Sequence, residues 1–235
     1  MVESMIKGVA KFQRGYFRKR RDTFTRLVRD GQTPHTLFIT CADSRIVPHA
    51  ITDCDPGELF VMRNVGNMVP PHEPGNECES TGAAIEYAVS ALGVSEIVVC
   101  GHSHCGACAG LFAGGDHAPG DELRLTKKWL EQGHKVRDLV LHRAGGQYDN
   151  VAPIFRSRDE REQILRATEK AMVVQHLANL KTYPAVARRV EEGTLRLHGW
   201  LYQIETGLVE TYDAERLAFV PVDRGVELAL ESVVS

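Results

Sequence analysis

The chain has 235 residues, of which 43% are hydrophobic and 25% charged, and its net charge is −3. A chain of this length forms one globular domain, or one domain with an appendage, and the small negative charge argues against general attraction to nucleic acid. No apolar run is long enough to cross a membrane, and the N-terminus lacks the apolar core of a signal peptide, so we expect a cytoplasmic protein.

Residues 1–30 have the apolar spacing of helices. The apolar positions recur every three or four residues and comprise Met5, Ile6, Val9, Phe12, Tyr16, Phe17, Phe24, Leu27 and Val28. Gly8 and Gly15 interrupt this pattern, so one helix and two helices fit it equally well. The stretch GQTP at 31–34 then ends the helical region.

Four short apolar segments predict strands, and predicted helices lie between strands, which favours a mainly parallel sheet. The strands are expected at 35–40, 58–62, 96–101 and 194–202, and a fifth at 208–213 follows a short turn and pairs antiparallel with the fourth. Helices are expected at 80–93, 159–180 and 184–193, and irregular segments at 113–122 and 143–158. The sequence therefore predicts an α/β fold with a mostly parallel central sheet of four strands plus an antiparallel edge strand, flanked by helices.

The longest predicted helix, 159–180, is amphipathic. Its apolar face contains Ile164, Leu165, Ala171, Met172, Val174 and Leu177. Thr168 is the one polar residue that we expect on that face.

Two of the predicted strands end in residues that bind metals. The first runs into CADSR, residues 41–45, and the third into GHSHCGAC, residues 101–108. Ligand sites in open α/β sheets lie beyond the carboxyl ends of the strands, so Cys41, His102 and Cys105 meet if these two strands are neighbours. Two thiolates and one imidazole leave the fourth position of a tetrahedral zinc ion open, which is the catalytic rather than the structural pattern.

Cys108 and His104 are the rival ligands in the second motif. Cys108 would complete a four-ligand structural site, or form a redox pair with Cys105. Gly106 and Ala107 suit the start of a helix packed close to the sheet, which favours Cys108 as a buried packing residue. The aromatic and proline neighbours typical of a redox pair are missing. For His104 the pattern favours solvent exposure, or support of a ligand, over ligation.

Asp43 and Arg45 follow the first thiolate at intervals of two and four residues. A carboxylate beside an open zinc position either accepts a hydrogen bond from zinc-bound hydroxide or becomes the fourth ligand. Arg45 can hold Asp43 in a bidentate contact that keeps it off the metal. An Asp-x-Arg sequence elsewhere would indicate only a surface ion pair.

CADSR followed about sixty residues later by GHSHCG resembles the paired signature of the β-class carbonic anhydrases. The segments PGELFVMRNVGNMVPP (56–71), GAAIEYAVSALGVSEIVVCGH (82–102) and LHGWLY (197–202) resemble further blocks of that family, so the resemblance extends from Gln32 to Asp213. It implies an enzyme that interconverts carbon dioxide and bicarbonate with one zinc ion per subunit. Cys41, His102 and Cys105 would be the ligands, and Asp43 with Arg45 the catalytic pair.

The resemblance also implies an assembly. It divides the chain into an N-terminal helical arm, 1–30, that reaches over a partner, and a zinc-binding catalytic domain, 31–235. The active site would lie at the interface of a homodimer or a higher even oligomer. Gln32 would enter the partner's site, as in the plant-like subgroup, and the substrate pocket would also contain Phe60, Val65, Tyr87 and Gly106.

A second subgroup of the family has a tryptophan three residues before the first ligand, as part of a site for inhibitory bicarbonate. This chain has Phe38 there, although it retains Arg63 and Tyr202, which resemble the other members of that site. Without the indole donor we expect an open active site in which Asp43 is not a zinc ligand near neutral pH. Two alternatives remain: a hydrolase of carbon disulfide or carbonyl sulfide that uses the same zinc chemistry, and a binding or assembly homologue without catalysis.

Overall fold

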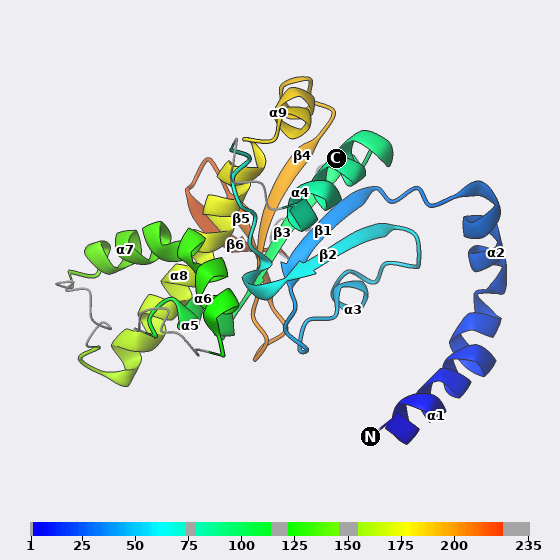
Figure 1. Cartoon of the computed structure of the whole chain (residues 1–235), viewed down its shortest axis with the longest axis horizontal. Helices are drawn as coiled ribbons and strands as arrows, with labels where there is room; N and C mark the ends of the chain where they lie inside the picture. The colour runs from blue at the N-terminus through cyan, green and yellow to red at the C-terminus, as the bar shows by residue number, and fades with distance from the viewer. Residues whose placement is uncertain (1, 74–78, 114–121, 146–154, 223–235) are drawn as a thin grey trace, which may run out of the picture.

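The computed structural model describes residues 2–73, 79–113, 122–145 and 155–222 (Figure 1). A single sheet lies at its centre, with strand order β2-β1-β3-β4-β5-β6. The four parallel strands are β1 (Thr36–Cys41), β2 (Leu59–Asn64), β3 (Glu96–His102) and β4 (Arg196–Tyr202). β5 (Val209–Asp213) pairs antiparallel with β4, and β6 (Ala218–Pro221) pairs antiparallel with β5. The predicted α/β fold with its parallel core is confirmed.

The edge of the sheet differs from the prediction, because β6 rather than β5 is the outer strand. β6 has only four residues and ends at Pro221, so its apolar pattern is too short to stand out. The Asp213 side chain accepts hydrogen bonds from the backbone N–H groups of Glu215 and Arg216. These contacts, with Leu217 at a φ of +51°, build the turn that brings β6 back onto β5.

The helices pack mainly on one face of the sheet. They are α3 (Pro48–Thr52), α4 (Glu79–Glu86), α5 (Gly106–Gly110), α6 (Arg124–Leu130), α7 (His134–Arg143), α8 (Arg158–Leu180) and α9 (Pro184–Glu191), with short 3-10 or π turns at 65–67, 87–91 and 131–133. The core contains Leu37, Ile39, Ile97 and Val99 of the sheet under α4, α8 and α9. On the other face Phe38, Val98 and Cys100 pack with Trp200 and Tyr202. The sequence had not predicted α3, α6 or α7, and the irregular segments expected at 113–122 and 143–158 lie largely outside the described residues.

The N-terminal region forms two helical pieces. α1 (Val2–Phe12) continues through a wider π turn at Gln13–Phe17, and α2 (Arg21–Asp30) follows a break at Arg20. An ion pair of 2.8 Å between Arg20 Nε and Asp55 Oδ1 joins this break to the loop before β2. None of the residues in α1 or α2 is buried in the single chain.

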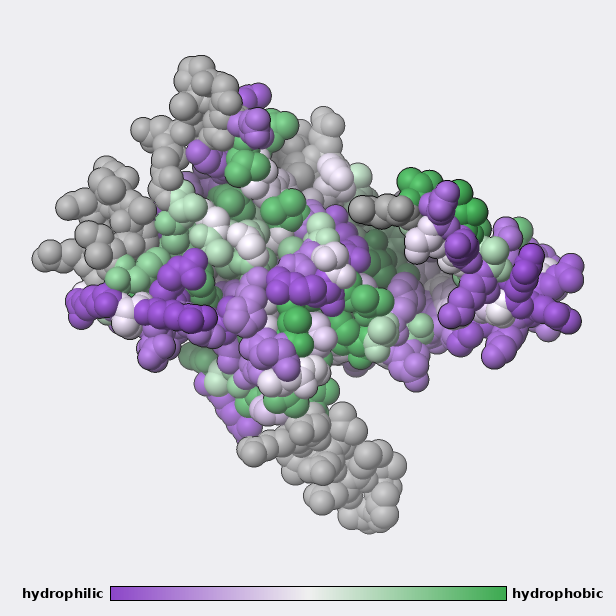
Figure 2. All heavy atoms as spheres, turned by 90° about the horizontal axis from the view of Figure 1, so that it is seen from below, coloured by the Kyte–Doolittle hydropathy of each residue, from purple (hydrophilic) through white to green (hydrophobic). Residues whose placement is uncertain are grey.

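The outer part of this segment exposes apolar side chains, which appear green beside charged residues at the right of Figure 2. They are Val2, Met5, Ile6, Val9, Phe12, Tyr16 and Phe17, each at least 37% exposed. Such a patch is unusual on a monomer and typical of a protein interface. Among the described helices, none is long and apolar enough to span a membrane.

α8 lies close to β3 and β4 because two glycines leave room for it. A side chain at Gly101 would lie 2.7 Å from Val173 Cγ2, and one at Gly199 would lie 2.9 Å from both Val173 Cγ1 and Leu177 Cδ1. The expectation that Thr168 is the one polar residue on the buried face of α8 is wrong, because Glu169 and His176 are also buried. Burial lowers the pKa of His176 to about 4, so its ring is neutral there.

Replacing Gly199 with alanine tests the close packing of α8. The added methyl group would overlap side chains of α8, so Gly199→Ala should lower the free energy of unfolding by about 1–3 kcal/mol. Gly82→Ala is the matched control, because its methyl group would meet only Tyr183 Cε1 at 3.8 Å. Urea unfolding of both variants measures the difference, and equal stabilities would contradict this account of the packing.

Candidate metal centre

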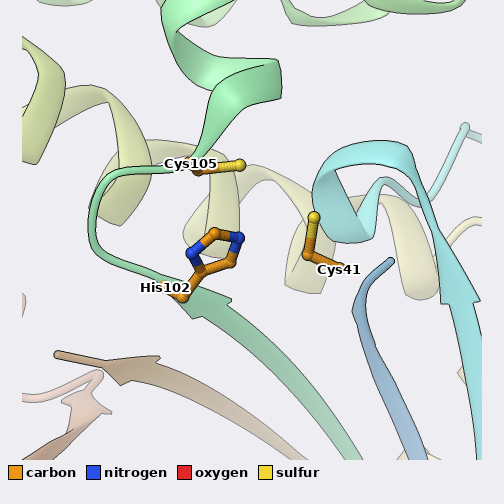
Figure 3. A group of neighbouring side chains, drawn as sticks. All are labelled: Cys41, His102 and Cys105. Carbon is orange, nitrogen blue, oxygen red and sulfur yellow. The ribbon is translucent and has the colours of Figure 1, made fainter. Parts of the chain in front are cut away.

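Three side chains meet beyond the carboxyl ends of β1 and β3. Cys41 is the last residue of β1 and His102 the last residue of β3, and these two strands pair in parallel. Cys105 follows after a short turn and precedes the first residue of α5. All three are buried, and their ligand atoms lie within 4.8 Å of one another, pointing to a common space (Figure 3). This is the only such group of histidine, cysteine and acidic residues among the described parts of the chain.

The imidazole of His102 is oriented for ligation through Nε2. Its Nδ1 lies 2.8 Å from the carbonyl oxygen of Ser103, so Nδ1 carries the hydrogen and Nε2 carries the lone pair. Nε2 is buried and has no hydrogen-bond partner. A buried polar atom without a partner is costly, and a cation in the space between the three side chains would satisfy it.

The two thiols would need a cation nearby in order to ionise. The adjacent Cys105 thiol, together with burial, raises the pKa of Cys41 to about 12. The pKa of Cys105 is also raised to about 12, by the neighbouring Cys108 thiol and by burial. Neither thiol ionises readily by itself, whereas a bound metal ion stabilises both thiolates directly. The backbone N–H of Gly66 donates to Cys41 Sγ at 3.3 Å, a contact that also favours the thiolate. Two sulfurs and one imidazole are a donor set that fits zinc.

The rival residues do not belong to this group. Cys108 is buried in an apolar cluster with Ala107, Leu111 and Leu130, in keeping with a packing residue. The side chain of His104 is 46% exposed, and its Nε2 lies 3.6 Å from Glu205 Oε1.

Asp43 and Arg45 form a tight ion pair at the edge of the group. Arg45 Nε lies 2.9 Å from Asp43 Oδ1, Arg45 Nη2 lies 2.7 Å from Oδ2, and the backbone N–H of Arg45 donates to Oδ1 as well. These contacts hold the pKa of Asp43 well below its usual range, so the carboxylate is ionised. Asp43 Oδ2 is 4.0 Å from His102 Nε2, close to the three ligand atoms but turned toward Arg45.

Two further charged residues support the group without belonging to it. Arg63 of β2 donates from Nε to the carbonyl oxygen of Cys41 and from Nη2 to that of Asp43. Glu169 of α8 accepts the backbone N–H of Cys105, and burial raises the pKa of Glu169 to about 7. The spacing of Leu165, Glu169 and Met172 could have revealed an acid on the buried face of α8. Nothing in the sequence indicates that Arg63 would contact these carbonyl groups.

The expected pocket residues fall into two groups. Val65 and Gly106 follow the carboxyl ends of β2 and β3, near Cys41 and Cys105. Gln32 precedes β1, and Cys41 is the last residue of β1. The six residues of this strand span about 20 Å, so Gln32 and Cys41 lie at opposite ends of the strand.

Phe60 and Tyr87 lie on the same side as Gln32. Phe60 pairs with Leu37 near the start of β1, four positions before the Asn64 that pairs with Cys41. The rings of Phe60 and Tyr87 contact each other at 5.8 Å between centroids. The structure thus separates Gln32, Phe60 and Tyr87 from the metal group of their own chain.

Comparisons with known proteins agree with this arrangement. A family model described as carbonic anhydrase matches residues 36–209. A carbonic anhydrase of Synechocystis is 42% identical over 93% of this chain and 74% of its own length. The solved β-carbonic anhydrase CcaA is 40% identical, with a TM-score of 0.81 over 94% of this chain and 98% of its own. Tetrameric β-carbonic anhydrases of Sordaria macrospora match at 26% identity and a TM-score of 0.73, over 89% of this chain and 95% of theirs. The chain belongs to the β-class carbonic anhydrases.

Proposed function

We propose that this chain catalyses the reversible hydration of carbon dioxide to bicarbonate and a proton, with one zinc ion held by Cys41, His102 and Cys105. The observation that carries the proposal is the convergence of these three buried ligand atoms, with His102 Nε2 unpartnered, beside the ion pair of Asp43 and Arg45. Zinc would supply Lewis acidity that makes water a nucleophile near neutral pH. The reducing cytoplasm, which keeps ligand thiols free, suits such a site.

Asp43 would orient the reacting water. Its ionised carboxylate accepts hydrogen bonds only, so a water proton directed at Oδ2 leaves an oxygen lone pair free to attack carbon dioxide. Arg45 keeps the carboxylate in place, because its guanidinium contacts both carboxylate oxygens and also donates to the carbonyl of His104. A carboxylate fixed in this way is not available as a fourth metal ligand.

We propose that the pocket for carbon dioxide is shared between two subunits. Val65, 45% exposed, and Gly106 would line it beside the metal, and the partner would contribute Gln32, Phe60 and Tyr87. Apolar walls suit an uncharged linear substrate, and the Gln32 amide can donate to an oxygen of bicarbonate. Their separation from the metal group within one chain supports this assignment, as does the exposed apolar surface of the arm, 1–30. A homodimer is the smallest assembly that completes the pocket.

We further propose that the chain is of the plant-like subgroup and lacks the inhibitory bicarbonate site. Phe38 is fully buried, packs in an edge-to-face arrangement with Trp200, and offers no hydrogen-bond donor from its side chain. The Arg63 guanidinium already donates to the carbonyl groups of Cys41 and Asp43. Relatives named carbonic anhydrase favour carbon dioxide over carbon disulfide or carbonyl sulfide as the substrate.

Removing a ligand thiol tests the metal assignment. Cys41→Ala should lose zinc and carbon dioxide hydration together, because one of three protein ligands is missing. Cys108→Ala is the matched control, since this thiol is buried nearby but lies outside the group, and it should retain both. Zinc analysis with stopped-flow hydration measures the two properties. An active, zinc-loaded Cys41→Ala variant would contradict the assignment.

Replacing Asp43 separates its proposed role from ligation. Asp43→Ala should keep zinc yet lower kcat by about 100-fold, the usual contribution of a positioned proton acceptor. Asp138→Ala removes an exposed ion pair with Arg137 and should leave kcat unchanged. Loss of zinc from the Asp43 variant would instead make Asp43 a metal ligand.

Mixing a Gln32→Ala variant, which should be impaired, with the Cys41→Ala variant tests the shared pocket. In a dimer of one Gln32→Ala chain and one Cys41→Ala chain, the site in the Gln32→Ala chain is complete. It keeps its three metal ligands and receives Gln32 from the other chain. Random exchange makes half of the dimers mixed, with one native site of two, so about a quarter of wild-type activity should return. If Gln32 served its own chain, the mixture would show no more activity than the two variants measured separately.

A further inference from the structure

Glu169 is a buried carboxylate that contacts the backbone of a proposed ligand. It is 2% exposed, and its Oε1 accepts the N–H of Cys105 at 2.9 Å. Its Oε2 lies 3.0 Å from Arg166 Nη1 without the alignment of a hydrogen bond. Glu169 reaches Cys105 because the glycine at position 101 lets α8 lie directly against the end of β3.

The segment between His102 and Cys105 adopts a backbone that needs support. His104 has a φ of +55°, a left-handed conformation that residues other than glycine rarely hold unless the surroundings impose it. This turn directs Cys105 Sγ back toward His102 Nε2. Three charged side chains contact the segment: Arg45 at the carbonyl of His104, Glu205 at the hydroxyl of Ser103, and Glu169 at the N–H of Cys105.

Glu169 differs from the other two contacts in position and burial. Among these three, it alone bonds to the backbone of a ligand residue. Arg45 and Glu205 are about half exposed, so water can replace their hydrogen bonds, whereas a buried N–H left without an acceptor keeps its full desolvation cost.

We infer that Glu169 is a positioning residue for the metal. Its carboxylate holds the backbone of Cys105 so that the thiol faces Cys41 and His102 before the ion binds. Binding then requires little ordering of the segment, which increases affinity. The inference rests on the proposed zinc site and adds a residue that supports the site without touching the metal.

Zinc affinity of Glu169 variants tests this role. Glu169→Leu removes the acceptor and should weaken zinc binding by about 10- to 100-fold, as loss of an outer hydrogen bond to a ligand does. Glu169→Gln keeps an acceptor oxygen and should recover most of that loss. Glu169→Ala also removes the acceptor but places no bulky apolar side chain beside Arg166. It should weaken zinc binding as Glu169→Leu does. Glu162→Leu, an exposed position on the same helix, is the matched control and should bind zinc normally.

Competition with a chromogenic chelator measures the affinities, and the cobalt-substituted proteins report ligand geometry through their visible spectra. We expect changed cobalt spectra in the leucine and alanine variants and a native spectrum in the glutamine variant. Native zinc affinity without the acceptor would overturn the inference, and so would an equal loss with glutamine. Wild-type protein that bound no zinc would instead overturn the proposed function, and this inference with it.

Discussion

The parallel pairing of β1 with β3 is the constraint on which the metal centre depends. Neighbouring strands lie about 4.8 Å apart, so two parallel strands that end together bring their last side chains within reach of one ion. Cys41 and His102 occupy those two positions, although 60 residues separate them in the sequence. A third ligand then needs only a short turn after β3, which Cys105 provides. The buried core under these strands fixes the distance between the first two ligands without any metal.

Charged side chains hold the backbone around this group from three directions. Arg63 on β2 contacts the carbonyls of Cys41 and Asp43, Arg45 contacts the carbonyl of His104, and Glu169 on α8 contacts the N–H of Cys105. The hydrogen bonds from the ionised Arg63 and Arg45 side chains are stronger than those between neutral groups, which suits segments that regular pairing does not hold. The neighbouring thiols and burial, by contrast, raise the pKa values of Cys41 and Cys105, so both thiols remain protonated until a cation arrives.

The elements and site residues that could be predicted are those marked by a pattern within a short stretch of sequence. Strands β1 to β5 follow from apolar runs, and the three proposed ligands follow from strand ends rich in cysteine and histidine. β6 was missed because four residues carry too weak a pattern, and the burial of Glu169 was missed because acids are rarely buried. The contacts of Arg63 join positions 22 and 20 residues apart, and only the folded sheet register brings them together.

The division of the proposed pocket between the two ends of the sheet connects assembly with catalysis. Gln32 and Phe60 lie toward the start of β1 whereas Cys41 is its last residue, so both are separated from the metal group of their own chain, and Tyr87 contacts Phe60. The same chain carries an 11-residue helix, α1, that buries none of its residues. Most helical stability in proteins comes from packing of an apolar face, so burial of this face against a partner would stabilise α1. The proposed interface, which would cover the arm and bring Gln32 to the neighbouring metal, would satisfy both requirements at once and would make the dimer rather than the single chain the catalytic unit.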